Sequence, residues 1–413
     1  MITVQDNIQS YIDKSGHDTV KIEYNGQSKT LKRKGVSTVA SENPFTFFVR
    51  AYRSSNYNVR ASNLDSLYSR SISAYYFAVD RSDESFFVNE SNVLYNRTKA
   101  GVAISSVSVA DLPGFKPFIF DGTYLYGIFL HYNGSSYDFN KTIYRFSKDL
   151  QTRDDWSIKV GTFPTSEEPG EDYYLYSMCL SQDGQYIYIA AHSLGAGLPK
   201  IAKFTLSAVG LLDDPIWNVD PNSAISSVYT MQADEDGNLY VGGLWPDPEY
   251  EAPPCNAKLL ANTGEVSWYK TYYDDDDIGT YLAYSNGTKS VYSSYNYWGD
   301  SDRVIQLDAS DGSVIGKTVS IGTSPGTPII GDDNTLIIGV SGSNPYIYTF
   351  DISDDWGESE NYIDSAMQIG TSIQFTGLGD PSGYINSKIN GGSAHCHGYE
   401  VDIKTKTKIE EIN

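Results

Sequence analysis

Short runs that alternate apolar and polar residues follow turn signals along most of the chain. Asp or Asn beside Gly favours a turn, because Asp accepts local backbone hydrogen bonds and Gly adopts positive φ at little cost. Alternation with a period of two predicts a β-strand with one buried face. The turns are Ser82-Asp83, Asp121-Gly122, Asp183-Gly184, Asp236-Gly237, Asn286-Gly287, Asp333-Asn334 and Ser382-Gly383. The β-prone runs that follow them are Phe86–Val88, Tyr124–Tyr126, Tyr186–Tyr188, Leu239–Val241, Ser290–Tyr292, Leu336–Ile338 and Tyr384-Ile385.

A second strand pattern recurs between these turns, in the same order each time. Its copies are Ile143–Ser147, Ile201–Thr205, Ala257–Ala261, Val304–Asp308, Ile347–Asp351 and Tyr399–Ile403, with a weaker first copy at Val93–Tyr95. The repeat interval is about 50 residues, which is enough for a four-stranded sheet. Such a sheet cannot bury both faces by itself, and a closed ring of sheets can. The predicted fold class is all-β, a seven-bladed β-propeller of four-stranded antiparallel blades over residues 41–413.

The two ends of the predicted ring are less regular in sequence. Phe45–Val49 predicts one strand, whereas Arg53–Leu67 is polar and is predicted to be irregular. An eighth blade would need another copy of the repeat within residues 41–80, so seven and eight blades both stay open at this point. The last run, Lys406–Ile412, alternates as a strand does and is predicted to pair with a strand from early in the chain.

Residues 1–40 have a different pattern and are predicted to form a separate N-terminal arm. Apolar side chains over residues 3–14 recur at the spacing of a short amphipathic helix, and Asn25-Gly26 predicts a β-hairpin after it. The hairpin region carries the densest basic cluster of the chain. One interpretation is a solvated hairpin that caps the ring, and the other is an arm that docks on an acidic partner. The docking residues would be Val4, Ile8, Ile12, Lys32, Arg33 and Lys34.

The net charge excludes several classes of partner. The chain has 52 Asp and Glu residues against 30 Lys and Arg residues, which gives a formal charge of −22. Nucleic-acid affinity comes mostly from basic groups that displace counterions, so no nucleic-acid binding is expected. No apolar run approaches the ~18 residues of a membrane span, so no membrane insertion is expected. The N-terminus lacks the basic and apolar regions of a Sec signal peptide.

One repeat resembles a known family. Leu259–Trp268, with the sequence LLANTGEVSW, resembles the repeat of quinoprotein-like (PQQ-like, WD40-like) β-propellers, and Leu307–Gly316 keeps part of it but loses the Trp. In that family the Thr-Gly pair makes a tight turn and the Trp packs between neighbouring blades. The resemblance implies these roles for Gly264 and Trp268. It implies little about chemistry, because propellers host many functions.

Signals for catalysis are weak, and the chain is predicted not to be an enzyme. An alcohol-oxidising quinone enzyme would carry an adjacent cysteine pair, whereas Cys179, Cys255 and Cys396 are far apart and are predicted to be buried thiols. Acidic pairs that could hydrolyse glycans do exist, in turn-like contexts where solvated Asp is the usual role. They are Asp154-Asp155, Asp213-Asp214 and Asp354-Asp355. A glycan-active hydrolase therefore remains an alternative.

Two segments contain side chains that could bind a metal. The run Asp274, Asp275, Asp276 and Asp277 offers the oxygen ligands that calcium prefers, but it lacks the alternating spacing of a calcium loop. A solvated acidic loop is therefore favoured there over a calcium site. In His395-Cys396-His397, adjacent residues of a strand would point to opposite faces, which disfavours zinc. No cofactor and no metal are expected.

Tyrosine is the remaining signal, with 34 copies, many of them beside Ser, Asn, Gly or Asp. Tyr combines a large contact area with a polar tip, as recognition surfaces do. The predicted contact residues are Tyr272, Tyr273, Tyr295, Tyr297 and Trp298. These features predict a non-catalytic structural and binding module.

The missing leader, the N-terminal arm and the Tyr-rich loops together resemble propeller-bearing proteins of bacteriophage and other virions. The resemblance implies a tail or capsid-associated protein, located in the virion, that docks on other virion proteins through its arm. Its loops would contact a host surface protein, a glycan or a neighbouring subunit. The alternative is a secreted or periplasmic propeller scaffold that binds other proteins.

Overall fold

The computed structural model of the chain consists of β-strands and their connections, and no helix occurs among the residues that it describes. The described backbone covers residues 19–24, 27–33, 46–51, 56–61, 66–71, 77–80, 85–98, 100–112, 115–128, 131–132, 137–138, 142–159, 173–193, 199–212, 214–221, 224–225, 227–244, 254–271, 281–295, 303–318, 328–330, 335–340, 346–352, 360–361, 365–368, 373–377 and 409–412. Side chains are described for most of this backbone between Ala78 and Ile352. The helix predicted over residues 3–14 lies outside the described part.

Most strands belong to sheets of four or five strands, and each sheet is named here by its first strand in spatial order. The sheets, in this order, are β34 (Ile373–Gly377), β3 (Thr46–Ala51), β4 (Asn56–Ala61) and β5 (Ser66–Ser71); β6 (Phe77–Asp80), β7 (Ser85–Glu90), β8 (Val93–Thr98) and β9 (Ala103–Ser108); β10 (Lys116–Phe120), β11 (Tyr124–Ile128), β14 (Thr142–Ser147), β15 (Arg153–Lys159) and β19 (Gly210–Leu212); β16 (Tyr173–Leu180), β17 (Tyr186–Ser193), β18 (Pro199–Thr205) and β20 (Trp217–Val219); β21 (Ser227–Ala233), β22 (Leu239–Leu244), β23 (Pro254–Leu259) and β24 (Val266–Thr271); β25 (Tyr281–Ser285), β26 (Ser290–Tyr295), β27 (Arg303–Asp308), β28 (Val314–Thr318) and β32 (Glu360–Asn361); and β29 (Ile329–Ile330), β30 (Thr335–Val340), β31 (Tyr346–Asp351) and β33 (Ser365–Gln368).

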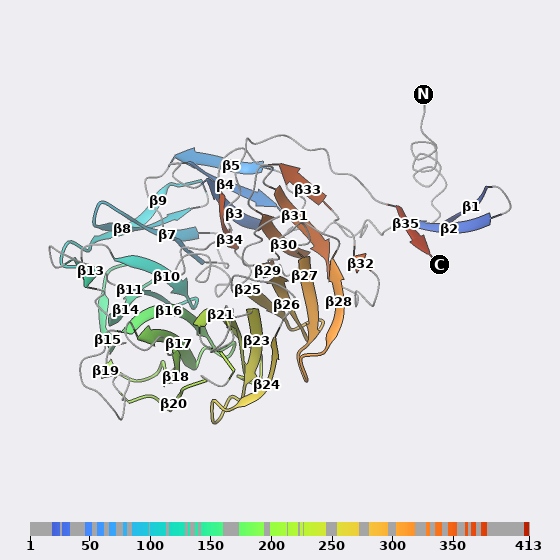
Figure 1. Ribbon diagram of the computed structural model, residues 1–413. Helices are drawn as coiled ribbons and strands as arrows, with labels where there is room; N and C mark the ends of the chain where they lie inside the picture. The colour runs from blue at the N-terminus through green and yellow to red at the C-terminus, as the bar shows by residue number, and fades with distance from the viewer. Residues whose placement is uncertain are drawn as a thin grey trace.

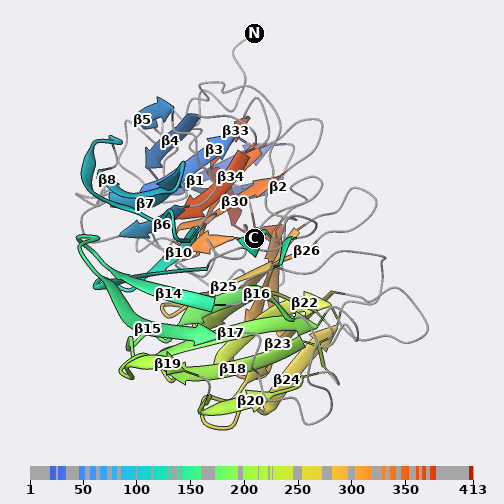
Figure 2. The same ribbon diagram turned by 90° about the vertical axis from the view of Figure 1, so that its left-hand side faces the viewer.

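The first strands of these sheets lie around a common axis (Figures 1 and 2). Strand β6 contacts β10, β16 contacts β21, β21 contacts β25, and β25 contacts β29. The circle closes where β34 contacts both β6 and β30. Strand β34 also pairs antiparallel with β3, from Phe47↔Gly377 to Ala51↔Ile373, so late and early strands share one sheet. This radial arrangement of antiparallel sheets is a β-propeller.

The chain ends meet a second time, beside the ring. Strands β1 (Thr19–Tyr24) and β2 (Gln27–Arg33) form the hairpin predicted at Asn25-Gly26. Strand β35 (Ile409–Ile412) pairs with β2, which confirms that the last run pairs with an early strand. This three-stranded sheet lies apart from the ring sheets in Figure 1. The division of the chain at residue 40 stays a prediction.

Residues 53–67 were predicted to be irregular, and this was wrong. Strand β4 lies wholly within that range, and β5 begins in it. Tyr57, Val59 and Ala61 do alternate with polar residues, but the short run is too polar to stand out without its neighbours. The repeat predicted at Ser382–Ile403 lies outside the described residues. The ring is closed instead by β34, which no sequence signal indicated.

The apolar core lies between adjacent sheets. One cluster joins Tyr188 and Ile201 of the β16 sheet to Met231, Val241 and Cys255 of the β21 sheet. Similar clusters fill the β6–β10, β21–β25 and β25–β29 junctions. Because every such cluster needs two sheets, each sheet depends on its neighbours for burial. A contact between neighbours is therefore the unit of stability in this ring.

Two further strands extend sheets at the outside of the ring. Strand β19 pairs in parallel with β15, through Trp156↔Gly210, Ser157↔Leu211 and Ile158↔Leu212. Strand β32 pairs in parallel with β28 in the same way. Both come from the chain that builds the following sheet. A separate short hairpin, β12 (His131–Tyr132) with β13 (Tyr137–Asp138), lies between β11 and β14 in the chain.

Candidate interaction surfaces

The predicted contact residues fall where the structure describes little. Tyr272, Tyr273, Tyr297 and Trp298 lie outside the described residues, and Tyr295 is described only as the last backbone position of β26. Of the predicted docking residues, Lys32 and Arg33 are backbone positions of β2. Val4, Ile8, Ile12 and Lys34 lie outside the described residues, and so do Asp274, Asp275, Asp276, Asp277 and His395 to His397. Their roles stay predictions.

The strand ends that flank the predicted contact segments do lie together. Tyr281 begins β25 opposite Ser294, and Tyr295 ends β26 opposite Arg303. Strand β24 ends at Thr271 and leads to β25, so both segments leave the ring at the same end of the sheets. This end is called the connection end. At the opposite end, called the turn end, short turns join first to second strands and third to fourth strands.

Asp side chains fix the turns at the turn end. In one turn, the Asp121 carboxylate accepts hydrogen bonds from the backbone N–H of Thr123 and Tyr124, at 2.7 and 2.6 Å. In another, Asp234 accepts from the N–H of Asp236 and Asn238, at 3.0 and 2.8 Å. Gly237 completes that turn with a φ of +79°. The sequence predicted these turns correctly from Asp and Gly.

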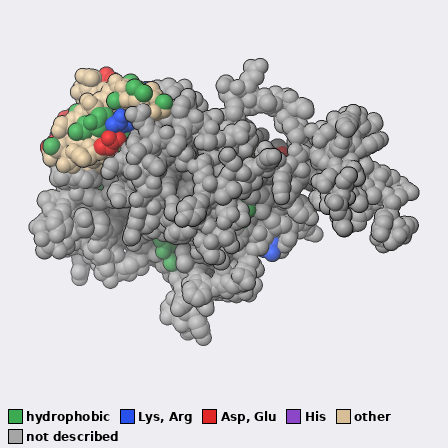
Figure 3. Space-filling view, turned by 90° about the horizontal axis from the view of Figure 1, so that it is seen from above, with side chains coloured by type: hydrophobic (Ala, Val, Ile, Leu, Met, Phe, Trp, Pro, Cys, Tyr) green, Lys and Arg blue, Asp and Glu red, His purple; other side chains and the backbone are tan. Residues whose placement is uncertain are grey.

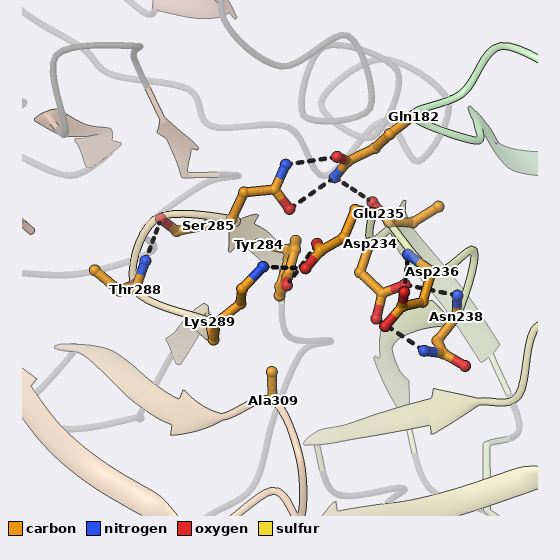
Figure 4. A network of polar contacts seen from close by, with 12 residues as sticks. Gln182, Asp234, Glu235, Asp236, Asn238, Tyr284, Ser285, Thr288, Lys289 and Ala309 are labelled. Carbon is orange, nitrogen blue, oxygen red and sulfur yellow. Dashed lines mark hydrogen bonds and ion pairs between the residues drawn. The ribbon is translucent and has the colours of Figure 1, made fainter.

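A polar network joins three sheets at the turn end (Figure 4). The Gln182 and Asn286 amides exchange two hydrogen bonds, of 3.2 and 2.5 Å, between the β16 and β25 sheets. Gln182 also donates to the carbonyl of Ala233, on the β21 sheet between them. Glu235 pairs with Lys289 and accepts a bond of 3.1 Å from the Tyr284 hydroxyl. The inner turns are therefore cross-linked to one another.

A buried row of three side chains crosses three of the sheets. Each row holds a Tyr on the second strand, a cation on the third and a Trp on the fourth. The rows are Tyr126, Arg145 and Trp156; Tyr188, Lys203 and Trp217; and Tyr240, Lys258 and Trp268. The Tyr and Trp rings lie 5.3, 5.9 and 6.2 Å apart in the three rows. The Lys203 ammonium lies 3.9 Å from the Tyr186 ring, within cation–π range.

These rows hold the next sheet by its backbone. Lys203 and the Trp217 indole both donate to the carbonyl of Ala261, at 2.9 and 3.0 Å. Lys258 and Trp268 both donate to the carbonyl of Ala309, at 3.1 and 3.3 Å. In the β10 sheet, Arg145 donates to the Leu206 carbonyl at 3.0 Å. Each acceptor lies in the third turn of the following sheet, so the row links adjacent sheets.

The receiving turn makes room for the Trp with a glycine. Gly264 has a φ of +73°, and a Cβ there would lie 2.7 Å from Trp217. Gly312 has a φ of +74°, and a Cβ there would lie 2.6 Å from Trp268. Only Gly tolerates both the conformation and the approach. The tight turn at Gly264 and the inter-sheet packing of Trp268, which the family resemblance implied, are both confirmed.

The β6–β10 junction is built differently. Asn96 takes the place of the cation and donates to the Lys148 carbonyl at 3.4 Å, and Ser105 takes the place of the Trp. The cation comes from the other side, because Lys148 pairs with the buried Asp80 of the β6 sheet. Leu150 stands where the other turns have glycine, with a φ of +59° and a buried side chain.

Burial sets the electrostatics of the rows. Desolvation lowers the pKa of Lys203, and the charge of Asp183 only partly opposes this shift. Burial first, and then neighbouring acidic groups, raises the pKa of Tyr126 and Tyr240 well above the usual range. Burial likewise raises the pKa of the Cys255 thiol. These groups stay in one protonation state near neutral pH, so they are suited to packing and not to proton transfer.

The described residues offer little material for catalysis. No group of three or more His, Cys, Asp or Glu side chains within them is placed to hold a metal. Asp154, from one of the acidic pairs, is bound by the Arg145 guanidinium at 2.8 Å. Cys179 and Cys255 are buried free thiols, as predicted, and Cys396 lies outside the described residues. A search of the described residues also finds no helix that could span a membrane.

Sequence reasoning missed the buried rows. Arg145, Lys203 and Lys258 lie in the recurring third-strand pattern, where a charged residue is expected on the solvent face. The available signal was their coincidence with Tyr126, Tyr188 and Tyr240 at one fixed position of each repeat. It shows up only when the repeats are aligned with one another.

The comparisons with known proteins follow this geometry. No protein-family model matches the sequence, and no curated protein matches it. A chain of a mitotic checkpoint complex is similar in structure, at a TM-score of 0.46 and 11% identity, over 78% of this chain and 87% of that chain. BamB from Moraxella catarrhalis is similar at 0.41 and 12% identity, over 87% and 93%. A eukaryotic initiation factor is similar at 0.42 and 11% identity, over 90% and 97%. The assignment of the ring rests on the strand order and register of this chain itself.

Proposed function

We propose that this chain is a non-catalytic, seven-bladed propeller that binds another protein at its connection end. Each four- or five-stranded sheet is one blade, and the β34 sheet closes the ring. The observation that carries the proposal is the contrast between the two ends. At the turn end the described polar groups join the blades to each other. The Tyr- and Trp-bearing segments leave the ring at the connection end. On this proposal the protein needs no cofactor.

The binding surface is tested by photo-crosslinking in the producing cell or particle. A photo-reactive amino acid replaces Trp298 in one variant and Asp311, a turn-end residue, in the matched control. We expect the Trp298 position to give one recurring adduct and the Asp311 position to give none. Equal adducts from both positions would contradict the surface assignment. Turnover of glycans or alcohols by the purified protein would contradict the non-catalytic part.

We further propose that the protein is part of a virion and docks there through its N-terminal arm. The sheet of β1, β2 and β35 supports this, because it lies apart from the ring and carries the basic cluster. Charge reversal at Lys32, Arg33 and Lys34 to Glu should abolish incorporation into particles while the far-UV spectrum stays unchanged. Lys270→Glu, on the exposed face of β24, is the control. Normal incorporation of the triple variant would contradict docking through the arm.

A further inference from the structure

A short apolar strand forms the outer edge of the β10 sheet. Strand β19 pairs with β15 on one side, and no described strand pairs with its other side. Val209 and Leu211, two residues apart, are 77% and 55% exposed, and Ile216 is 52% exposed. An exposed apolar edge offers both backbone hydrogen bonds and apolar surface to an incoming strand.

We infer that this edge, made of residues 209–212 with Ile216 and called the β19 edge, binds an extended segment of a partner protein by strand addition. The segment alternates apolar and polar residues and carries Lys or Arg at its flanks. This inference goes beyond the proposed function, because the β19 edge lies on the outside of the ring and does not involve the Tyr-bearing segments.

The charges around the β19 edge indicate the kind of partner. In the parallel register Trp156↔Gly210, Asp155 is level with Val209, and Asp155 is exposed. Asp214, also exposed, follows the other end of β19. Arg153 pairs with Asp111. Carboxylates thus stand at both ends of an apolar strip, which complements a segment with an apolar middle and basic flanks.

The same charges disfavour a second copy of this chain as the occupant. Two copies would each bring a formal charge of −22 to the contact, and their acidic flanks would face each other. A basic segment gains attraction where a second copy meets repulsion. The partner is therefore a different protein.

Strand addition at an outer edge is already used twice within the ring. Strands β19 and β32 are short segments that extend the sheets of β15 and β28 in parallel. Backbone hydrogen bonds supply most of the affinity in this mode, and alternate side chains supply selectivity. The outer edges of the blades therefore accept extended segments, and the β19 edge is the position left open with apolar side chains beside it.

The probe for the test is a labelled peptide of alternating Val and Thr with lysines at both ends, titrated against the full chain by fluorescence anisotropy. We expect saturable binding that weakens about tenfold, ~1.4 kcal/mol, in the Val209→Lys, Leu211→Lys double variant. Asp155→Asn with Asp214→Asn should weaken this peptide but not a version with neutral flanks. Two N-methylated peptides, blocked at alternate amides, separate strand pairing from charge attraction, because only one set of amides faces the edge.

Ile104→Lys is the matched control, on another edge. Val102 and Ile104 are 58% and 54% exposed at β9, in the surface patch of Figure 3, but the neighbouring Arg97 and Glu90 neutralise each other. Unchanged binding in this variant supports the inference. Loss of binding in the control, equal binding of both N-methylated peptides, or no saturable binding would overturn it. Concentration-dependent dimers that disappear in the double variant would overturn it in favour of a second copy.

Discussion

The β16–β21 and β6–β10 junctions fill the same space from opposite sides. At the first, Lys203 and Trp217 reach forward from one sheet to the Ala261 carbonyl, and Gly264 leaves room for them. At the second, the receiving turn supplies both large groups, since Lys148 reaches back to Asp80 and Leu150 fills the core.

The difference teaches what a junction of this ring requires. It needs one buried cation and one large apolar group, and it does not matter which sheet supplies them. At the β6–β10 junction, Asn96 and Ser105 are small because their volume has been supplied by Lys148 and Leu150. The four positions change together, so a single substitution at either junction should be costly.

The largest effect is expected where glycine makes room for Trp. Gly312→Ala combines a left-handed backbone with a Cβ that would lie 2.6 Å from Trp268. We expect a loss of about 3 kcal/mol in the free energy of unfolding, from backbone strain and overpacking. Gly184→Ala is the control, because Gly184 has a φ of +68° and no atom within 4 Å of the added Cβ. Its loss should be about 1 kcal/mol. Equal losses in urea unfolding would show that the Trp contact does not matter.

The next effect comes from the reversed cation. Lys148→Met leaves Asp80, which is only 2% exposed, without this ammonium group. Removing one partner of a buried pair is costly, and the partial exposure of Lys148 reduces the cost, so we expect a loss of about 2 kcal/mol. The variant Lys148→Arg keeps the charge and should recover most of it. Full stability of Lys148→Met in urea unfolding would mean that Asp80 does not depend on this partner.

The forward cation should matter less and should respond to pH. Lys203 donates to a carbonyl that Trp217 also satisfies, so Lys203→Met should cost about 1 kcal/mol at pH 7. Burial lowers the pKa of Lys203, so the unfolded chain binds more protons between the folded and the unfolded pKa. The Lys203 contribution to stability therefore rises with pH through that window and levels off above the unfolded value.

The measurement is the difference in unfolding free energy between wild type and Lys203→Met at a series of alkaline pH values. Taking the difference removes the opposing contribution of the buried tyrosines, whose raised pKa lowers stability at high pH in both proteins. The difference should grow with pH. A difference that stays constant or shrinks would mean that the Lys203 pKa is not lowered by burial.

The sequence predicted the framework of these junctions better than their contents. Asp-Gly and Thr-Gly turns are local signals, and the turns at Asp121, Asp183, Asp236 and Gly264 lie where they were expected. Trp268 was identified through the family resemblance. A local pattern cannot show that Lys203 and Lys258 point into a junction, because the carbonyl they bind belongs to a turn more than fifty residues away.

Closure of the ring was also hidden from local patterns. Strand β34 is short and follows no turn signal of the repeat, and its partner β3 lies at the other end of the chain. Only the unsatisfied edge of β3 requires it. The predicted contact residues, from Tyr272 to Trp298, depend on loop sequences that no repeat constrains, and their roles rest on the proposed experiments.

The smallest effect is expected at the exposed pair of Glu235 and Lys289, which also bridges the β21 and β25 sheets. Burial alone would raise the pKa of Glu235, but hydrogen bonds from Lys289, its own backbone and Tyr284 lower it overall. Both side chains are exposed enough for salt to screen them, so a double-mutant cycle with Glu235→Gln and Lys289→Met should give a coupling of about 0.5 kcal/mol. Added salt should reduce that coupling and leave the cost of Gly312→Ala unchanged. A coupling as large as the loss in Gly312→Ala would place the strength of this junction in its surface ion pair, against the buried contacts that distinguish the two junctions.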